Sequence, residues 1–200
     1  SHSTGFRAPT VGQANVVNTA TSMVEGELIQ SFTAPPTDPL AAFYGGKELE
    51  PEESVSYAVG MVVQNGDFFM TADYYNIEVT DRIAQSSQIS VNPEDYQALE
   101  AAGVKNPELI SAVTYFANDF DTTTQGIDLV ANYSMNLFEG DTQLSLAYNW
   151  TDTKVDSFNP LTTNQGKIDR LEDGMPAHRG TFTVAQTWED VSMFIRANYF

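Results

Sequence analysis

The feature that most constrains the fold is an alternation of apolar and polar residues with period two, repeated in separate segments. In residues 54–63 the odd positions from Val55 to Val63 are apolar, while even neighbours such as Ser54 and Gly60 are small or polar. Successive side chains of a β-strand point to opposite faces, so this pattern predicts a strand with one apolar and one polar face. The pattern recurs in residues 127–133, 142–151, 181–185 and 191–199.

The connections between these segments alternate between short and long. Asn65-Gly66-Asp67 and Glu189-Asp190 are tight hairpin signals, and residues 135–141 make a short link with a glycine near its end. Short turns on one rim and long loops on the other are typical of outer-membrane barrels, whose strands need about 9–11 residues to cross the membrane. The long connections run roughly from Thr10 to Glu52, from Asp81 to Asn118 and from Lys154 to Ala177.

These patterns predict an all-β chain of antiparallel up-and-down strands that crosses a membrane as part of a β-barrel. One short helix is expected in the second long loop, where Asn92 can cap it, Pro93 suits its first turn and Gly103 can end it. A further helical turn is expected after Asn106. Otherwise the long loops are predicted to be irregular.

Charge and composition exclude several classes of protein. Nine Lys and Arg residues against 27 Asp and Glu residues leave a net charge of −18, which argues against nucleic acid or an anionic lipid surface as the partner. Because cysteine is absent, the chain has no disulfide framework and no thiolate metal site. No run reaches the roughly 18 apolar residues of a membrane helix, so a membrane-spanning chain of this kind must cross as strands.

The sequence gives no support for catalysis or for a bound cofactor. His2 and His178 are the only histidines, and neither a nucleophile elbow nor a zinc-protease motif occurs. Residues 119–123 (DFDTT) faintly resemble a calcium loop but lack its glycine and its terminal glutamate. We therefore expect neither an enzyme nor a metal site, and we interpret Asp119 and Asp121 as part of a solvated loop.

Several linked motifs, in matching order and spacing, resemble one known family, the TonB-dependent outer-membrane receptors. The strongest begin with STGFRAPT at residues 3–10, followed by Gly12 and Gln13, and continue with LEPEES at residues 49–54, leading to Tyr57 and Gly60. The remaining motifs are YYNIEVTDRI at residues 74–83, YFAN at 115–118, TQGID at 124–128 and, more weakly, PAHR at 176–179.

The resemblance implies a location in the outer membrane of a Gram-negative bacterium, in contact with outer-membrane lipid, with periplasmic short turns and extracellular long loops. It also implies uptake of a scarce nutrient, such as a ferric siderophore, cobalamin or a carbohydrate, powered by the TonB complex. Such transporters close with about 22 strands around a plug, whereas about seven strands are expected here. The resemblance therefore implies that residues 1–200 are part of the barrel domain, a partial arc of an outer-membrane transporter barrel with long extracellular loops, without plug or C-terminal strands. In isolation the chain is expected to self-associate through its unpaired edges.

In such receptors the plug apices and the extracellular loops contact the substrate. On that resemblance the candidate contacts in this chain are loop residues Tyr96, Tyr115, Phe116, Asp119 and Arg170.

Charged residues on or beside strands form a second group of candidates: Arg7, Asp73, Arg82 and Arg196. A barrel would point them into its wet lumen, toward a plug or a substrate. The simpler explanation is that any polar strand face needs polar residues.

Two alternatives to a receptor remain at this point. A soluble all-β ligand- or carbohydrate-binding module, such as a sandwich, also has alternating strands, although it would hide its apolar faces against each other. A β-rich hydrolase lacks any recognisable nucleophile or acid/base pair.

Overall fold

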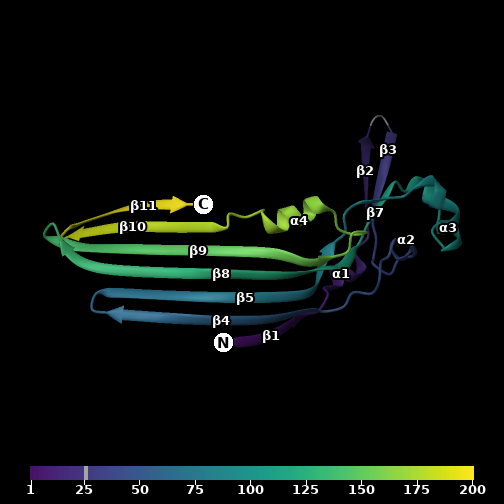
Figure 1. Cartoon of the computed structure of the whole chain (residues 1–200). Coiled ribbons are helices and arrows are strands. Elements are labelled where there is room, and N and C mark those ends of the chain that lie inside the picture. Colours follow the sequence, from purple (N-terminus) through teal and green to yellow (C-terminus); the bar gives the residue numbers. More distant parts are fainter. Residues whose placement is uncertain (25–26) are drawn as a thin grey trace.

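The computed structural model describes residues 1–24 and 27–200; residues 25 and 26, in the first predicted long connection, lie outside the described residues. One antiparallel sheet of seven strands dominates the structure, and its spatial order follows the order of these strands along the chain (Figure 1). The predicted all-β, up-and-down architecture is confirmed, and this sheet has the seven strands expected; four further strands were not predicted. From one edge to the other, the strands are β1 (His2–Arg7), β4 (Glu52–Asn65), β5 (Phe68–Gln85), β8 (Phe116–Leu137), β9 (Gly140–Phe158), β10 (His178–Trp188) and β11 (Val191–Tyr199).

Three two-residue turns join neighbouring strands at one end of the sheet, on the left of Figure 1. The turn between β8 and β9 consists of Phe138 and Glu139, which both have positive φ, at 52° and 57°. Two positive φ values are what a type I′ hairpin turn requires, although Gly and Asn are its usual residues. The predicted glycine of this link, Gly140, instead opens β9, where a Cβ atom would lie 2.5 Å from the Thr187 carbonyl oxygen.

At the other end the strands extend further than the alternation predicts. β5 continues to Gln85 and β9 to Phe158, so both strands enter segments predicted to be loops. A β-bulge interrupts β5 between Val79 and Arg82, and Asp81 has a φ of 55°. In these extensions the period-two pattern fades, while the backbone hydrogen bonds of the sheet continue.

The cross-strand register puts the apolar side chains of successive strands on one face of the sheet. Tyr74, Ile127 and Trp150, for example, form one row across β5, β8 and β9. The side chains of this face, which we call the apolar belt, are Val55, Tyr57, Val59, Met61 and Val63 of β4, Phe68, Met70, Ala72 and Tyr74 of β5, Ile127, Leu129, Ala131 and Tyr133 of β8, Leu144, Leu146, Tyr148 and Trp150 of β9, Phe182 and Val184 of β10, and Val191, Met193, Ile195, Ala197 and Tyr199 of β11.

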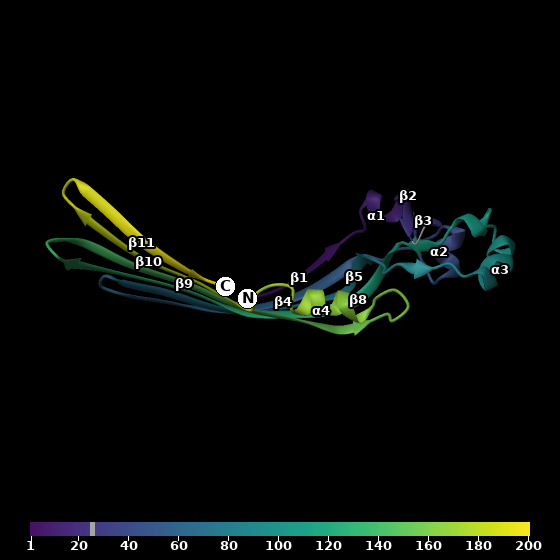
Figure 2. The same ribbon diagram turned by 90° about the horizontal axis from the view of Figure 1, so that it is seen from above.

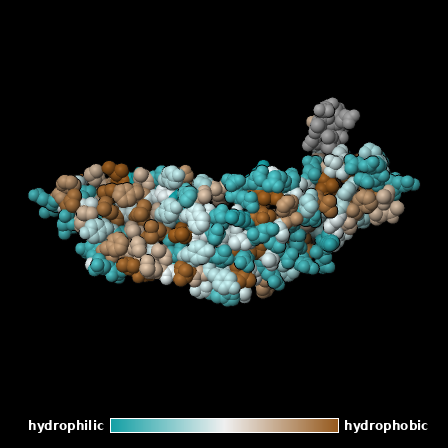
Figure 3. All heavy atoms as spheres, in the orientation of Figure 1, coloured by the Kyte–Doolittle hydropathy of each residue, from teal (hydrophilic) through white to brown (hydrophobic). Residues whose placement is uncertain are grey.

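Nothing in the described part of the chain covers this belt. Ten of its large apolar side chains are at least 40% exposed, with Val59 at 67% and Ile195 at 66%. Figure 3 shows apolar surface gathered over the half of the sheet nearer the short turns. Soluble monomers rarely expose a continuous apolar surface of this kind, so the belt requires an apolar environment such as lipid.

On β5, β8 and β9 the belt ends abruptly toward the long loops, whereas on β4 it continues for two more rows, to Tyr57 and Val55. One row beyond Tyr74, the cross-strand partners are the polar residues Asn76, Gln125 and Asp152. From Val55 to Val63, β4 spans about 27 Å at roughly 3.4 Å per residue, comparable with the apolar band of about 25 Å on outer-membrane barrels. In the described residues, no helix is long and apolar enough to cross a membrane.

The first two long connections were predicted to be irregular, and this prediction is wrong. They fold together into a small lobe beside the long-loop rim (Figures 1 and 2). Its sheet has the order β2-β3-β7-β6, and β3 from the first connection pairs in parallel with β7 from the second. The strands of the lobe are β2 (Asn18–Val24), β3 (Glu27–Thr33), β6 (Ile89–Ser90) and β7 (Ala112–Thr114), and its helical segments are α2 (Pro39–Phe43), η1 (Pro93–Asp95), α3 (Tyr96–Ala101) and η2 (Pro107–Leu109).

The predicted helix of the second connection is confirmed as η1 followed by α3. Asn92 occupies the N-cap position but makes no capping hydrogen bond through its side chain. Gly103 follows α3 with a φ of +96°, the left-handed conformation that favours glycine at a helix end. The expected turn after Asn106 is η2.

The lobe has its own hydrophobic core, to which both connections contribute. The first supplies Leu40, which is 1% exposed, and the second supplies Leu99, Val113 and Tyr115, each fully buried. Tyr115 also donates a hydrogen bond of 2.6 Å to the Tyr44 carbonyl oxygen. Burial of such side chains is the main force that holds the two connections together.

Two helices outside the lobe were not predicted. Helix α1 (Val11–Asn15) follows β1 and begins with a capping box between Thr10 and Gln13. Helix α4 (Gln165–Glu172) lies in the third long connection, and the Asn164 side chain caps it by accepting from the Lys167 N–H.

Candidate functional site

A cavity of about 430 Å³ gathers most of the positive charge near the long-loop end of the main sheet. Its lining includes four of the nine Lys and Arg residues of the chain. Because the chain carries a net charge of −18, such a concentration of cations does not follow from composition. The residues that line this basic cavity are Arg7, Glu52, Arg82, Ile83, Ala84, Phe120, Lys167, Arg170 and Leu171.

The cavity lies on the face of the sheet opposite the apolar belt. Glu52 has the same parity along β4 as Ser54 and Ser56, which alternate with the belt residues. Arg7 pairs directly with Glu52 across β1 and β4, so it lies on that face too. In a barrel whose belt faces lipid, this polar face lines the lumen, and the cavity sits above the level of the belt.

Arg7 and Glu52 form a bidentate ion pair on this face. Arg7 Nε and Nη2 donate to the two carboxylate oxygens of Glu52, each at 2.6 Å, and the Ile83 N–H donates to Glu52 Oε1 at 2.7 Å. The hydrogen bond from Arg7, with that from the Ile83 N–H, holds the pKa of Glu52 below its usual value. The same pair raises the pKa of Arg7. Glu52 therefore remains an anion fixed by three donors.

Arg82 and Lys167 both lie near the ring of Phe120, which is 6% exposed. The Arg82 guanidinium carbon lies 5.6 Å from the ring centroid and Lys167 Nζ lies 5.4 Å from it, within the range of cation–π attraction. Arg82 Nη1 also donates to Thr122 Oγ1 at 3.1 Å. Phe120 thus forms an aromatic wall that positions two cations.

A buried ion pair anchors α4 beside the sheet. Lys167 Nζ lies 2.8 Å from Asp119 Oδ2, and the Asp119 side chain is fully buried. Thr162 and Thr163 donate their hydroxyl groups to the same carboxylate, and Lys167 also donates to the Gln85 carbonyl oxygen at 2.8 Å. We call this group, Asp119 with Thr162, Thr163 and Lys167, the Asp119 latch.

The latch corrects the interpretation of residues 119–123 as a solvated loop. Asp119 belongs to β8 and is 3% exposed. A buried carboxylate needs a cation and hydrogen-bond donors, and these come from the third connection, more than 40 residues away in sequence. In the described residues, no group of His, Cys, Asp and Glu is arranged to hold a metal ion.

The five predicted contact residues are not brought together. Tyr115 lies in the lobe core, where burial, aided by the charge of Asp119, raises its pKa to about 12. Tyr96 packs half-buried against the same core, and Phe116 is half-buried at the start of β8. A ligand reaches neither Tyr115 nor Asp119 without displacing their neighbours. Arg170 is exposed and lines the basic cavity.

The charged residues predicted on strands also lie in different parts of the structure. Arg7 and Arg82 meet in the basic cavity, whereas Asp73 and Arg196 lie elsewhere on the polar face. Lys167 was not a candidate, and no local pattern marks it, because its role depends on residues distant in sequence.

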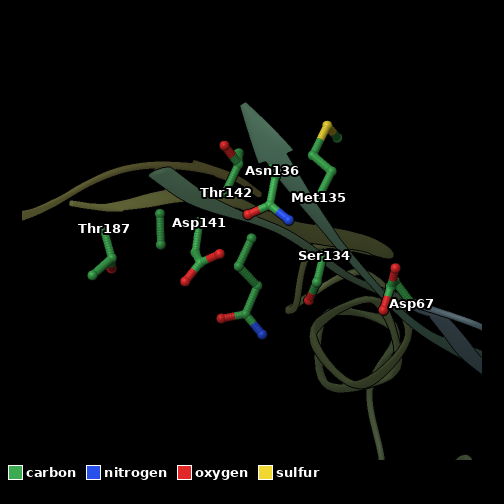
Figure 4. Close-up of a pocket in the computed structure, with 9 residues that line it drawn as sticks. Asp67, Ser134, Met135, Asn136, Asp141, Thr142 and Thr187 are labelled. Atoms are coloured by element: carbon green, nitrogen blue, oxygen red, sulfur yellow. The ribbon is translucent and has the colours of Figure 1, made fainter. Parts of the chain in front are cut away.

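A second cavity, of about 410 Å³, lies near the short turns (Figure 4). Figure 4 shows Ser134 and Asp141 pointing to one side of the strands and Met135 and Thr142 to the other. Among the described residues that line it, two are acidic, Asp67 and Asp141, and none is Lys or Arg. Since its lining comes from both faces of the sheet, we take the basic cavity as the candidate site.

Comparison with known families identifies the architecture. The family described as TonB dependent receptor-like, beta-barrel, matches residues 1–200, the whole chain. The chain belongs to this family. Its members are receptors and transporters of the Gram-negative outer membrane, not enzymes, and they take up nutrients. Comparison with curated proteins gives no match.

Membership in this family relates each face and each rim of the sheet to a part of the barrel. The exposed belt corresponds to the lipid-facing band of such a barrel, and the polar face to the lumen side. In such a barrel the lobe and α4 would belong to the rim of the long loops. The basic cavity lies between α4 and strands β1, β4, β5 and β8 of the main sheet.

Proposed function

We propose that residues 1–200 form part of the barrel wall of an outer-membrane receptor that takes up a scarce nutrient through the TonB complex. The nutrient classes that fit such a receptor are ferric siderophores, cobalamin and carbohydrates. In this proposal the seven strands belong to a larger closed barrel, because an open sheet in lipid would leave backbone groups unsatisfied at both edges.

The observation that carries the proposal is the uncovered apolar belt across β4 to β11, with a polar face behind it. In water this belt would drive association or collapse, whereas in lipid it needs no cover. The rim of the sheet away from the short turns carries the folded lobe and the basic cavity. This placement suits capture of a ligand from outside before its passage through the lumen.

The experiment is an uptake assay with the full-length receptor expressed in a Gram-negative host that lacks its own receptors for the nutrients tested. Labelled ferric siderophores, cobalamin and oligosaccharides are supplied to cells with and without TonB. We expect uptake of one class only, and only in cells with TonB. Equal uptake in both strains would contradict the proposal.

The soluble binding module is tested separately, with residues 1–200 alone. A sandwich would cover its apolar face with a second sheet, but the small sheet of the lobe lies at the loop rim. We expect the isolated chain to self-associate in detergent-free buffer and to disperse in detergent. A monodisperse monomer without detergent, measured by light scattering, would favour the soluble module.

A further inference from the structure

The basic cavity has an excess of positive charge that its own residues do not balance. Its lining carries four cations and one anion, Glu52, and Asp119 lies beneath Lys167 as a second anion. Four positive charges against two negative charges leave an excess of two. With 27 acidic residues available in the chain, the missing counter-charges are not explained by a shortage of carboxylates.

The excess resides on two arginines. Glu52 is held by Arg7 through both oxygens, and Asp119 is held by Lys167. Within the described part of the chain, neither Arg82 nor Arg170 forms an ion pair, although Arg82 is close enough to contribute to the lowered pKa of Glu52. Both arginines line the same cavity.

The fold holds these arginines from two directions. Arg82 follows the bulge of β5 and is positioned by Thr122 and the Phe120 ring. Arg170 lies three residues after Lys167 on α4, so the two side chains share one face of the helix. Because the Asp119 latch fixes Lys167 against the sheet, it also directs Arg170 to the cavity.

Size and chemistry define what the cavity can accept. About 430 Å³ falls within the range of small-molecule sites, which is roughly 300–1,000 Å³. Two guanidinium forks match oxyanions that accept two parallel hydrogen bonds, such as carboxylate or phosphate groups. Phe120, Ile83 and Leu171 supply apolar surface beside them.

We propose that the basic cavity binds an oxyanion group, a carboxylate or a phosphate, of the transported ligand between Arg82 and Arg170. This inference rests on the proposed uptake function and names the charge class of its ligand. The bound oxyanion supplies the negative charge that balances Arg82 and Arg170, on the lumen side of the extracellular rim.

The test is calorimetric titration of the full-length receptor in detergent at low ionic strength with citrate, inorganic phosphate or neutral maltose. We expect citrate or phosphate to bind with a Kd of about 1 mM or lower, and maltose not to bind. Citrate alone would assign the site to carboxylates, and phosphate alone to phosphate groups. Arg82→Gln and Arg170→Gln should each weaken binding by about tenfold.

Arg196→Gln is the matched control, because Arg196 lies on the same polar face but outside the cavity. It should change the Kd by less than about twofold. If Arg82→Gln disturbs folding through Thr122, Arg170→Gln still decides the question, because its side chain makes no hydrogen bond to the described residues.

Two results overturn the inference: neither anion binds, or binding weakens equally in Arg196→Gln and Arg170→Gln. These results are distinguishable from failure of the uptake proposal. TonB-dependent uptake without anion binding would refute the cavity assignment alone, and anion binding without TonB-dependent uptake would refute the uptake function alone.

Discussion

Removal of the Asp119 carboxylate should release α4 from the sheet. Asp119→Ala leaves the Lys167 ammonium without its counter-ion and the hydroxyl groups of Thr162 and Thr163 without their acceptor. Breaking a buried ion pair by removing one partner costs about 3–5 kcal/mol. Since the Lys167 side chain is 24% exposed and regains some hydration, we expect about 3 kcal/mol.

This loss should appear as local opening, because the latch holds one connection and not the barrel strands. Hydrogen exchange of the α4 amides in the full-length receptor is therefore the assay, and 3 kcal/mol corresponds to exchange faster by about 150-fold. The control is Asp173→Ala, because Asp173 is an exposed acid of the same connection that forms no ion pair in the described residues.

A double-mutant cycle measures the coupling energy between Asp119 and Lys167. Lys167→Met removes the other partner, and the combined variant should be destabilised by about 2 kcal/mol less than the sum of the single changes. Additive effects, or exchange in Asp119→Ala accelerated less than about threefold, would show that the ion pair does not hold α4.

Three further expectations concern the belt, the lobe and the Glu52 pair. Ala131→Arg, in the middle of the belt, should lower the free energy of unfolding in lipid vesicles by about 2–4 kcal/mol, whereas Val130→Arg on the polar face should lower it far less; equal losses would contradict the assignment of faces. Leu99→Ala should destabilise the lobe by about 2–5 kcal/mol and expose both of its connections to protease while the barrel keeps its heat-modifiable migration on gels; cleavage confined to the second connection would argue against a shared core. Glu52→Gln should destabilise the Arg7 contact at pH 7. Because the pKa of Glu52 is lowered in the folded state, the difference from wild type in unfolding free energy should be present above pH 4.5 and vanish as the pH falls through the lowered pKa. A difference that persists in acid would contradict this.

The strands that carry the belt could be predicted because the polarity of each residue depends on the face of the sheet on which its side chain lies. A strand between lipid and a wet lumen must alternate, and residues 54–63 and 142–151 do so. The family resemblance added the expectation that the short turns are periplasmic and the long loops extracellular. The alternation does not extend beyond the belt, so β5, β8 and β9 were predicted too short.

The site could be predicted only in part, because its contacts join residues far apart in sequence. Arg7 and Arg82 stood out as charges on strands, and Arg170 as a charge in a loop, but no pattern showed that they meet. The burial of Asp119 was missed because a run of Asp and Thr is ordinarily solvated. Its partner Lys167 lies 48 residues further along the chain.

The shared core of the lobe limits how this receptor can be engineered. Extracellular loops are the usual places to insert epitopes or to exchange segments between homologous barrels, on the assumption that each loop is an independent module. Here β3 of the first loop is hydrogen-bonded to β7 of the second, and Tyr115 is buried beneath Tyr44. A graft that replaces one of these loops removes half of a folded unit, so the two must be transplanted as a pair.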